Sequence, residues 1–351
     1  MDREPPCARS CADFAFRFLA LASASKGGGF KFSLDEFKFS GASRSNLAKR
    51  YGGAASRGGL QILKHERKNM KTIRLLYPDF LSGGLDEYYF GAQLLCLIVP
   101  PNDDQPLIRV PISAPNDEKK PVKGGIYARD EVEAGVKSAL NLIERENPDK
   151  IITIGGNCIV SLAPFDYLHG KYGDTGIIWL DAHPDVSTPQ DGYAYAHAMV
   201  LGTLLGQGDA GLRALMKNGA FEPQNLLYVG LQGLHDYQER YLNKLGVKFK
   251  IQDKNFIPHA EIAAFCAKFK RVLIHLDIDV LDAAFFHSTY FANPELTGDG
   301  SGGGRMKMSE LKEILRLINQ SCDVSGLSIA EYLPFDEFRL RGALEVMDIF
   351  K

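Results

Sequence analysis

Acids and histidines collect in two short segments of the sequence, each directly after an apolar run. Residues 181–185 read Asp-Ala-His-Pro-Asp after IIWL, and residues 277–279 read Asp-Ile-Asp after VLIHL. In an extended segment, side chains two residues apart point to the same side, so each motif is expected to aim its donors at one centre. Burying several carboxylates together is very unfavourable unless a cation neutralises them. The predicted metal ligands are Asp181, His183, Asp185, Asp277 and Asp279.

The donor types predict the kind of metal and its chemistry. Four carboxylates and one imidazole form an oxygen-rich set that suits Mn²⁺ or a similar hard ion better than a structural zinc. Their combined charge of about −4 is too large for one dication in a buried cleft and matches two. Two dications that share a water lower its pKa and present a metal-bound hydroxide to an electrophile. The alternative is that each acid is merely an N-cap, a turn residue or half of an ion pair.

The elements that would position these donors form an alternating pattern from Met70 onward. Short apolar runs predict strands at residues 73–77, 150–156, 175–183, 225–231, 270–282 and 324–334. Apolar residues at helical spacing predict helices over 130–148 and 308–320, the second with Ser309 as its N-cap. This alternation predicts an α/β fold, one three-layer α/β/α domain with a central parallel sheet. In such sheets, functional residues gather at the carboxyl ends of the strands, where both acidic motifs stand.

Composition excludes several classes of function. The 351 residues include 41 Lys and Arg against 43 Asp and Glu, for a formal charge of −2. This balance argues against a nucleic-acid or membrane-surface binder, because those need a strong basic excess. No stretch approaches the roughly 18 uninterrupted apolar residues of a membrane span. Six cysteines without a C-x-x-C spacing predict a reducing, cytoplasmic setting.

Residues 1–69 differ from the rest of the chain. They hold 13 Lys and Arg against 6 Asp and Glu, and they are rich in Ser and Gly without a sustained helical or strand period. The segment is expected to be a basic, disordered extension, with the catalytic domain at 70–351. Either it is a targeting segment, or Met70 is the functional start of the protein.

Four motifs together resemble the ureohydrolase superfamily of arginase, agmatinase and formiminoglutamase. They are DAHPD (181–185), HLDIDVLD (275–282), GGNC (155–158) and SIAEYLP (328–334). The resemblance implies an arginase-like α/β/α fold and a binuclear centre with two Mn²⁺ per chain. It also implies hydrolysis of a guanidino C–N bond in a small-molecule substrate, as part of arginine metabolism, by a homo-oligomer that is a trimer or a hexamer.

The same resemblance implies how the metal ligands divide. Asp181 and Asp277 match two carboxylates that bridge both metals. His183 and Asp279 then belong to one metal, and Asp185 belongs to the other.

Four side chains are expected to act on the substrate or on the attacking hydroxide. His197, in YAHAM, matches a histidine that protonates the departing amine, and Glu331 matches the acid that pairs with a guanidinium. Asp185 would orient the attacking hydroxide. Ser187 stands where arginases have an asparagine that reads the carboxylate of the amino acid, so Ser187 is a candidate substrate contact.

The first motif departs from the family. The usual G-G-D-H-S is replaced by Gly-Gly-Asn-Cys, so Cys158 stands in place of a ligating histidine. Because thiolate is soft and Mn²⁺ is hard, Cys158 is a doubtful ligand, and the first site is either weak or filled by another divalent metal. Alternatively, Cys158 is a small buried hydrophobic residue.

The run CIVSLA is similar to the branch that hydrolyses Nω-hydroxy-arginine. The leading hypothesis is therefore a metal-dependent amidinohydrolase acting on arginine or an arginine derivative. The alternative is a catalytically impaired relative, a sensor or assembly subunit with an incomplete metal site.

An aromatic segment, residues 283–296, follows the second acidic motif. Its aromatic side chains are expected either to line the mouth of the cleft or to pack against a neighbouring subunit.

Overall fold

The computed structural model describes residues 70–116, 118–253, 255–294, 298, 300–334, 344, 347 and 349. The expected basic extension, residues 1–69, lies outside the described residues. The described residues belong to one unit of the chain, Ile62–Lys351. No helix among them has the combined length and apolar character needed to cross a lipid bilayer.

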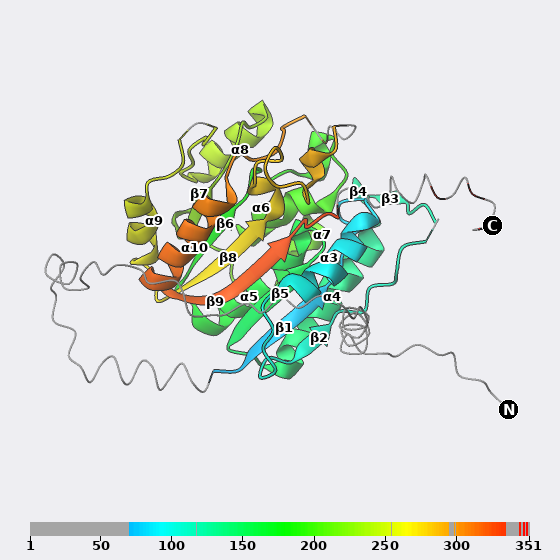
Figure 1. Cartoon of the computed structure of the whole chain (residues 1–351), viewed down its shortest axis with the longest axis horizontal. Helices are drawn as coiled ribbons and strands as arrows, with labels where there is room; N and C mark the ends of the chain where they lie inside the picture. The colour runs from blue at the N-terminus through cyan, green and yellow to red at the C-terminus, as the bar shows by residue number, and fades with distance from the viewer. Residues whose placement is uncertain are drawn as a thin grey trace, which may run out of the picture. The chain divides into compact units, whose positions relative to one another are not determined.

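A parallel sheet forms the centre of this unit (Figure 1). Its seven described strands lie in the order β2-β1-β5-β9-β8-β6-β7, and every neighbouring pair is parallel. The bounds are β1 Thr72–Tyr77, β2 Leu107–Arg109, β5 Lys150–Gly155, β6 Thr175–Leu180, β7 Leu226–Val229, β8 Arg271–Asp277 and β9 Asp323–Ala330. The six predicted strands are all present, and the predicted parallel sheet is confirmed. The edge strand β2 was not predicted, and a short antiparallel hairpin joins β3 (Val122–Lys123) to β4 (Ile126–Tyr127).

Helices connect the strands and cover both faces of the sheet. The helices are α3 Glu87–Ile98, α4 Arg129–Glu146, α5 Leu162–Tyr172, α6 Val200–Leu204, α7 Ala210–Arg213, α8 Asp236–Leu245, α9 His259–Cys266 and α10 Met308–Ser321. Helices α4, α5 and α6 contribute to one hydrophobic core, whereas α9 and α10 contribute to a second. The N-cap of α10 is Lys307, so the prediction of Ser309 as N-cap is wrong.

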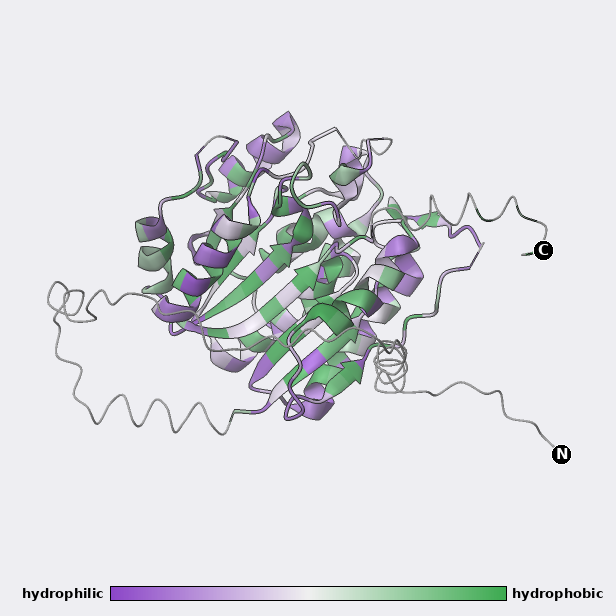
Figure 2. Ribbon diagram, in the orientation of Figure 1, coloured by the Kyte–Doolittle hydropathy of each residue, from purple (hydrophilic) through white to green (hydrophobic). Residues whose placement is uncertain are grey.

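Alternation along the strands explains the two cores. In β6, Ile177 and Trp179 face the first core, and Ile178 and Leu180 face the second. Both sets are fully buried, because helices lie on each side of the sheet. Figure 2 shows strands that are mostly hydrophobic and helices with hydrophilic outer faces. This is the three-layer α/β/α fold predicted from the sequence.

Four neighbouring strands, β5, β9, β8 and β6, bring the motifs of the sequence to the same edge of the sheet. Because the strands are parallel, their carboxyl ends lie side by side. The last residues of these strands and the segments that follow them contain all of the predicted metal ligands.

Candidate metal centre

The second acidic motif is shaped by a tight turn. Asp277 is the last residue of β8, and a short 3₁₀ turn, Ile278–Val280, follows it. The backbone N–H of Asp279 donates to Asp277 Oδ1 at 2.7 Å. The two carboxylates therefore converge through this turn, and the expected extended conformation is wrong.

The first acidic motif leaves the sheet earlier than predicted, because β6 ends at Leu180. Asp181 accepts hydrogen bonds from the indole Nε1–H of Trp179 at 2.8 Å and from the backbone N–H of His183 at 2.6 Å. Asp185 has a φ of 50°, in the left-handed region that non-glycine residues rarely adopt. Its Oδ2 is buried and has no hydrogen-bond partner among the described residues.

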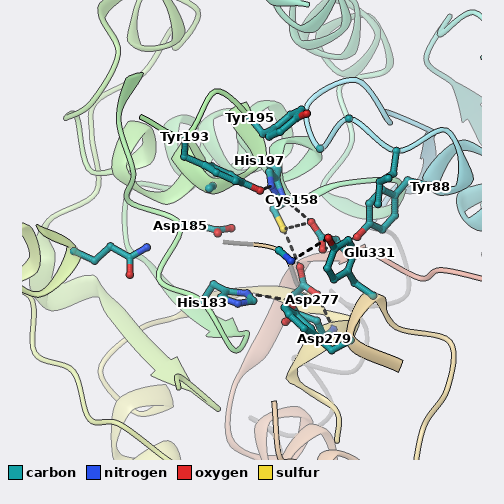
Figure 3. A pocket seen from close by; sticks show the side chains of 18 residues that line it. Tyr88, Cys158, His183, Asp185, Tyr193, Tyr195, His197, Asp277, Asp279 and Glu331 are labelled. Atoms are coloured by element: carbon teal, nitrogen blue, oxygen red, sulfur yellow. Dashed lines mark hydrogen bonds and ion pairs between the residues drawn. The ribbon is translucent and has the colours of Figure 1, made fainter. Parts of the chain in front are cut away.

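The two motifs meet at one place (Figure 3). His183 Nδ1 lies 2.9 Å from Asp279 Oδ2 and 3.6 Å from Asp181 Oδ1. One ligand atom from each of these three residues lies within 4.8 Å of the others, and the same holds for Asp277, Asp279 and Glu331. The arrangement can therefore offer several donors to a small cation.

Burial and mutual repulsion raise the pKa values of three carboxyl groups of the cluster. Burial, reinforced by repulsion from Asp279, raises the pKa of Asp181 to about 7. Burial also raises the pKa of Asp277, to which the charge of Asp279 contributes, and the pKa of Asp185, to which Asp181 contributes. Divalent cations would relieve this repulsion, and carboxylate oxygens are the donors that hard ions prefer. The residues present therefore fit a metal pair.

His183 and Asp279 form an ion pair within the cluster. Burial acts to lower the pKa of His183, but the Asp279 carboxylate outweighs burial and raises it. Burial acts to raise the pKa of Asp279, but the neighbouring His183, together with hydrogen bonds, lowers it. In the absence of metal, the imidazolium therefore neutralises part of the negative charge.

Cys158 lies beside Asp277, one of the two carboxylates expected to bridge the metals. It begins a 3₁₀ turn, Cys158–Ser161, that follows β5. Its Sγ lies 2.9 Å from Asp277 Oδ2 and 3.4 Å from Glu331 Oε1. Burial, followed by repulsion from Asp277, raises the thiol pKa well above its usual value. The thiol is therefore protonated and donates to both carboxylates.

Glu331 anchors the other side of the site. It follows β9, has a φ of 61°, and its backbone N–H donates to Gly156 O at 2.6 Å. Its Oε1 lies 2.7 Å from His197 Nδ1, and its Oε2 accepts from the hydroxyl of Tyr88 at 3.1 Å. His197 Nε2 in turn lies 2.9 Å from the hydroxyl of Tyr193. A chain of polar contacts thus connects Tyr193, His197 and Glu331.

These groups surround a cavity of about 210 Å³. Its described lining residues include His183, Asp185, Asp277, Asp279, Glu331, His197 and Cys158. Asp181 is fully buried behind them. Ser187 does not line the cavity: it is 2% exposed, and its hydroxyl lies 3.0 Å from the hydroxyl of Tyr237.

The aromatic segment contributes to the cavity in part. Tyr290 and Phe291 line it, and the ring of Phe291 lies 5.7 Å from that of His183. Phe285, in contrast, is 69% exposed.

Sequence reasoning missed several residues of the site. Tyr88 and Tyr193 gave no signal, because single tyrosines are common in buried positions. His275 did offer a signal: it stands two residues before Asp277 on the same strand, so strand alternation places both side chains on one face.

The sequence is similar to known proteins. The sequence model of the Arginase family matches residues 114–346. The arginase of Staphylococcus aureus (strain MRSA252) is 24% identical over 198 residues, which cover 54% of this chain and 62% of that protein. The formimidoylglutamase of Bacillus subtilis (strain 168) is 28% identical over 203 residues, which cover 55% of this chain and 57% of that protein. The chain thus spans less than two thirds of the length of these curated relatives.

Solved structures share the fold. The crystal structure of Entamoeba histolytica arginase in complex with L-ornithine matches with a TM-score of 0.62 and 17% identity. The match covers 76% of this chain and 92% of that one. Because the family model matches well over half of the sequence, the chain belongs to the arginase family.

Proposed function

We propose that the chain is a metal-dependent amidinohydrolase that cleaves the guanidino C–N bond of arginine or an arginine derivative. One observation carries the proposal: the donors of two distant acidic motifs converge at a cavity that also contains Glu331 and His197. Membership of the arginase family supports the same class of reaction. The catalytic domain is proposed to be residues 70–351, preceded by the extension 1–69.

Two divalent ions would be held by the acidic motifs. The proposed ligands are Asp181, His183, Asp185, Asp277 and Asp279, with Cys158 as a doubtful addition. When bound, such ions supply Lewis acidity and an activated water. The oxygen-rich donors support Mn²⁺, whereas the position next to Cys158 would be weaker or occupied by another divalent metal.

Glu331 is the proposed partner of the substrate's guanidinium. A planar cation is held best by a carboxylate that offers two oxygens. Glu331 lines the cavity, and contacts with His197 and Tyr88 hold its Oε1 and Oε2 in place. The cavity's described lining also contains tyrosines and no Lys or Arg, which suits a cationic group. Ser187 contacts Tyr237, the neighbour of the lining residue Gln238, so any part it has in reading the far end of the substrate is indirect.

Two side chains are placed to handle protons. The unpartnered Oδ2 of Asp185 can accept a hydrogen bond from the attacking water and orient it. His197, between Glu331 and Tyr193, can donate a proton to the departing amine. The products would be urea, or a urea derivative, and the corresponding amine.

The contacts of Cys158 favour a second candidate function. Its thiol is bonded to Asp277, a proposed metal ligand, and to Glu331, the proposed guanidinium partner. A site in which a thiol occupies both of these carboxylates would suit a non-catalytic sensor or assembly subunit. The two functions differ in metal content and turnover.

The test is a substrate panel. The full chain is stripped of metal, reloaded with Mn²⁺, and assayed for urea and hydroxyurea released from arginine, agmatine, Nω-hydroxy-arginine and guanidino acids. The proposal predicts turnover of at least one of these, with Nω-hydroxy-arginine a strong candidate because of the Cys158 motif. Two bound metals without any turnover would contradict it and favour the non-catalytic function.

We also propose a cytoplasmic homo-oligomer, either a trimer or a hexamer. Three cysteines of the described residues, Cys158, Cys266 and Cys322, are free thiols, which agrees with a reducing compartment. Helix α3 carries exposed apolar side chains that would suit a subunit contact: Phe90, Leu94, Leu97 and Ile98. Light scattering of the purified chain would measure the mass, and a monomer would contradict this part of the proposal.

A further inference from the structure

His275 is an unusual histidine on the central strand β8. Its side chain is fully buried, and its ring stacks on the indole of Trp179, with 3.7 Å between ring centroids and an interplanar angle of 15°. The stacking holds the imidazole in one orientation.

The two ring nitrogens have different surroundings. Nδ1 lies 2.7 Å from the hydroxyl of Ser161. Nε2 is buried without a hydrogen-bond partner among the described residues, 3.8 Å from Asp181 Oδ2. Leaving a buried polar atom unsatisfied is costly, so a partner for Nε2 is expected.

Nε2 lies next to the position where the sequence departs from its family. One ligand atom of His275 lies within 4.8 Å of those of Cys158, Asp181 and Asp277, and these are in turn within the same distance of one another. The four residues come from the ends of β5, β6 and β8. Cys158 stands where the family motif has a histidine. The imidazole of His275 therefore lies close to the position of the histidine that this chain lacks.

We propose that His275 is a metal ligand of the site that contains Cys158, and that its Nε2 supplies the imidazole that position 158 lacks. The inference rests on the proposed function, because both need divalent ions. The contact between Nδ1 and Ser161 would orient the ring, as hydrogen bonds to the second nitrogen do for ligating histidines. A nitrogen and a sulfur beside the carboxylates of Asp181, Asp185 and Asp277 form a softer donor set than the rest of the centre, so this site should prefer Co²⁺ or Zn²⁺ to Mn²⁺.

The variant His275→Phe tests the proposal, because it keeps an aromatic ring against Trp179 and removes both nitrogens. The metal-stripped full chain is titrated with Co²⁺, and visible absorption follows binding, since thiolate-to-cobalt bands report the ion beside Cys158. The wild-type chain is expected to bind two ions. His275→Phe should weaken the ion with the thiolate band at least about tenfold and leave the other ion unchanged.

A matched control is His169→Phe. His169 also stacks on an aromatic ring, that of Phe221 at 4.0 Å, and its Nδ1 bonds Thr175 Oγ1 at 2.8 Å. It does not line the cavity, so its loss should leave both cobalt affinities as in the wild type.

Two further variants complete the test. If metal-free His275→Phe is unfolded, as judged by thermal unfolding, His275→Gln replaces it, with the same expected loss. In Cys158→His, which restores the family's imidazole, His275→Phe should cost less than in the wild type.

The outcomes separate the inference from the proposed function. A wild-type chain that binds no divalent ion would contradict both. A wild-type chain that binds two ions, with unchanged cobalt affinity and thiolate band in a folded His275 variant, would overturn only the role of His275.

Discussion

Glu331 is surrounded by three polar groups in the metal-free site. His197 and Tyr88 contact its two oxygens, and the thiol of Cys158 lies 3.4 Å from Oε1. The carboxylate is therefore positioned before a substrate binds, which lowers the entropic cost of capturing a guanidinium. Function therefore depends on which of these three contacts Glu331 retains when the substrate binds.

Glu331→Gln should lower kcat/KM for the best guanidino substrate by about 10²-fold or more, because the amide keeps the shape and loses the charge that pairs with the cation. Metal content should stay at the wild-type value, as measured by elemental analysis. Glu261→Gln, which changes an exposed carboxylate on α9 paired with Lys250, serves as the control and should be near-neutral. Equal activity of Glu331→Gln and the wild type would contradict the role assigned to Glu331.

His197→Gln should lower kcat by roughly 10²–10⁴-fold, the usual range for loss of a general acid. Steady-state assays at saturating substrate would measure the effect. His259→Gln, at the exposed start of α9, should behave like the wild type. A kcat of His197→Gln equal to that of the wild type would count against proton donation by this residue.

The residues of the site were predictable to different degrees. Asp181 and Asp277 stand in short motifs whose residue types and spacing already indicate metal chemistry. Tyr88 reaches Glu331 across 243 residues of sequence, and such a pairing is created only by the fold. His275 could have been predicted from the sequence, because it stands two residues before Asp277 on one strand, so both side chains point to the same face.

Strand ends set the geometry of the site at the level of elements. The strands were predicted correctly, but two of them end earlier than their apolar runs. β6 ends at Leu180 and β8 at Asp277. At each end an aspartate side chain accepts from the backbone N–H two residues further on, Asp181 from His183 and Asp277 from Asp279, and this contact turns the chain out of the sheet. The edge strand β2 was missed because it has only three residues and pairs on one side only.

Gly156 keeps the carboxyl ends of β5 and β9 close together. Its carbonyl accepts from the N–H of Glu331, and an added Cβ would lie 1.7 Å from Asp79 O. Gly156→Ala should lower the free energy of unfolding by about 1–3 kcal/mol, since backbone must shift, and should also lower activity by displacing Glu331. Urea unfolding would measure the first effect and the guanidino assay the second.

Gly219→Ala is the control for this change, because an added Cβ there meets nothing within 4 Å. Its stability and activity should match the wild type. A Gly156→Ala chain as stable and active as Gly219→Ala would contradict the packing described here.

The stability of the whole molecule is linked to the charge of its centre. The folded chain raises the pKa of Asp181 to about 7, whereas an unfolded chain has the usual value of about 4. Between these values the folded state holds a proton that the unfolded state has released, so metal-free stability falls as pH rises. The raised pKa values of Asp185 and Asp277 act in the same direction.

Thermal unfolding of the metal-stripped full chain should therefore give a midpoint that decreases from about pH 5 to about pH 7.5. Added divalent metal should restore the midpoint, most strongly at the higher pH, because cations replace the bound protons. Asp181→Asn removes one titrating group and should flatten the pH dependence. An identical slope in that variant would show that the effect arises elsewhere in the chain.

The number of divalent ions that the full chain retains tests the central claim most directly. The wild type and an Asp181→Asn, Asp277→Asn double variant are dialysed against Mn²⁺, Co²⁺ or Zn²⁺, and bound metal per chain is quantified. We expect about two ions in the wild type and a large loss in the variant, in which both bridging carboxylates are gone. A folded wild-type chain that retains none of these ions would contradict the metal centre and the hydrolytic function built on it.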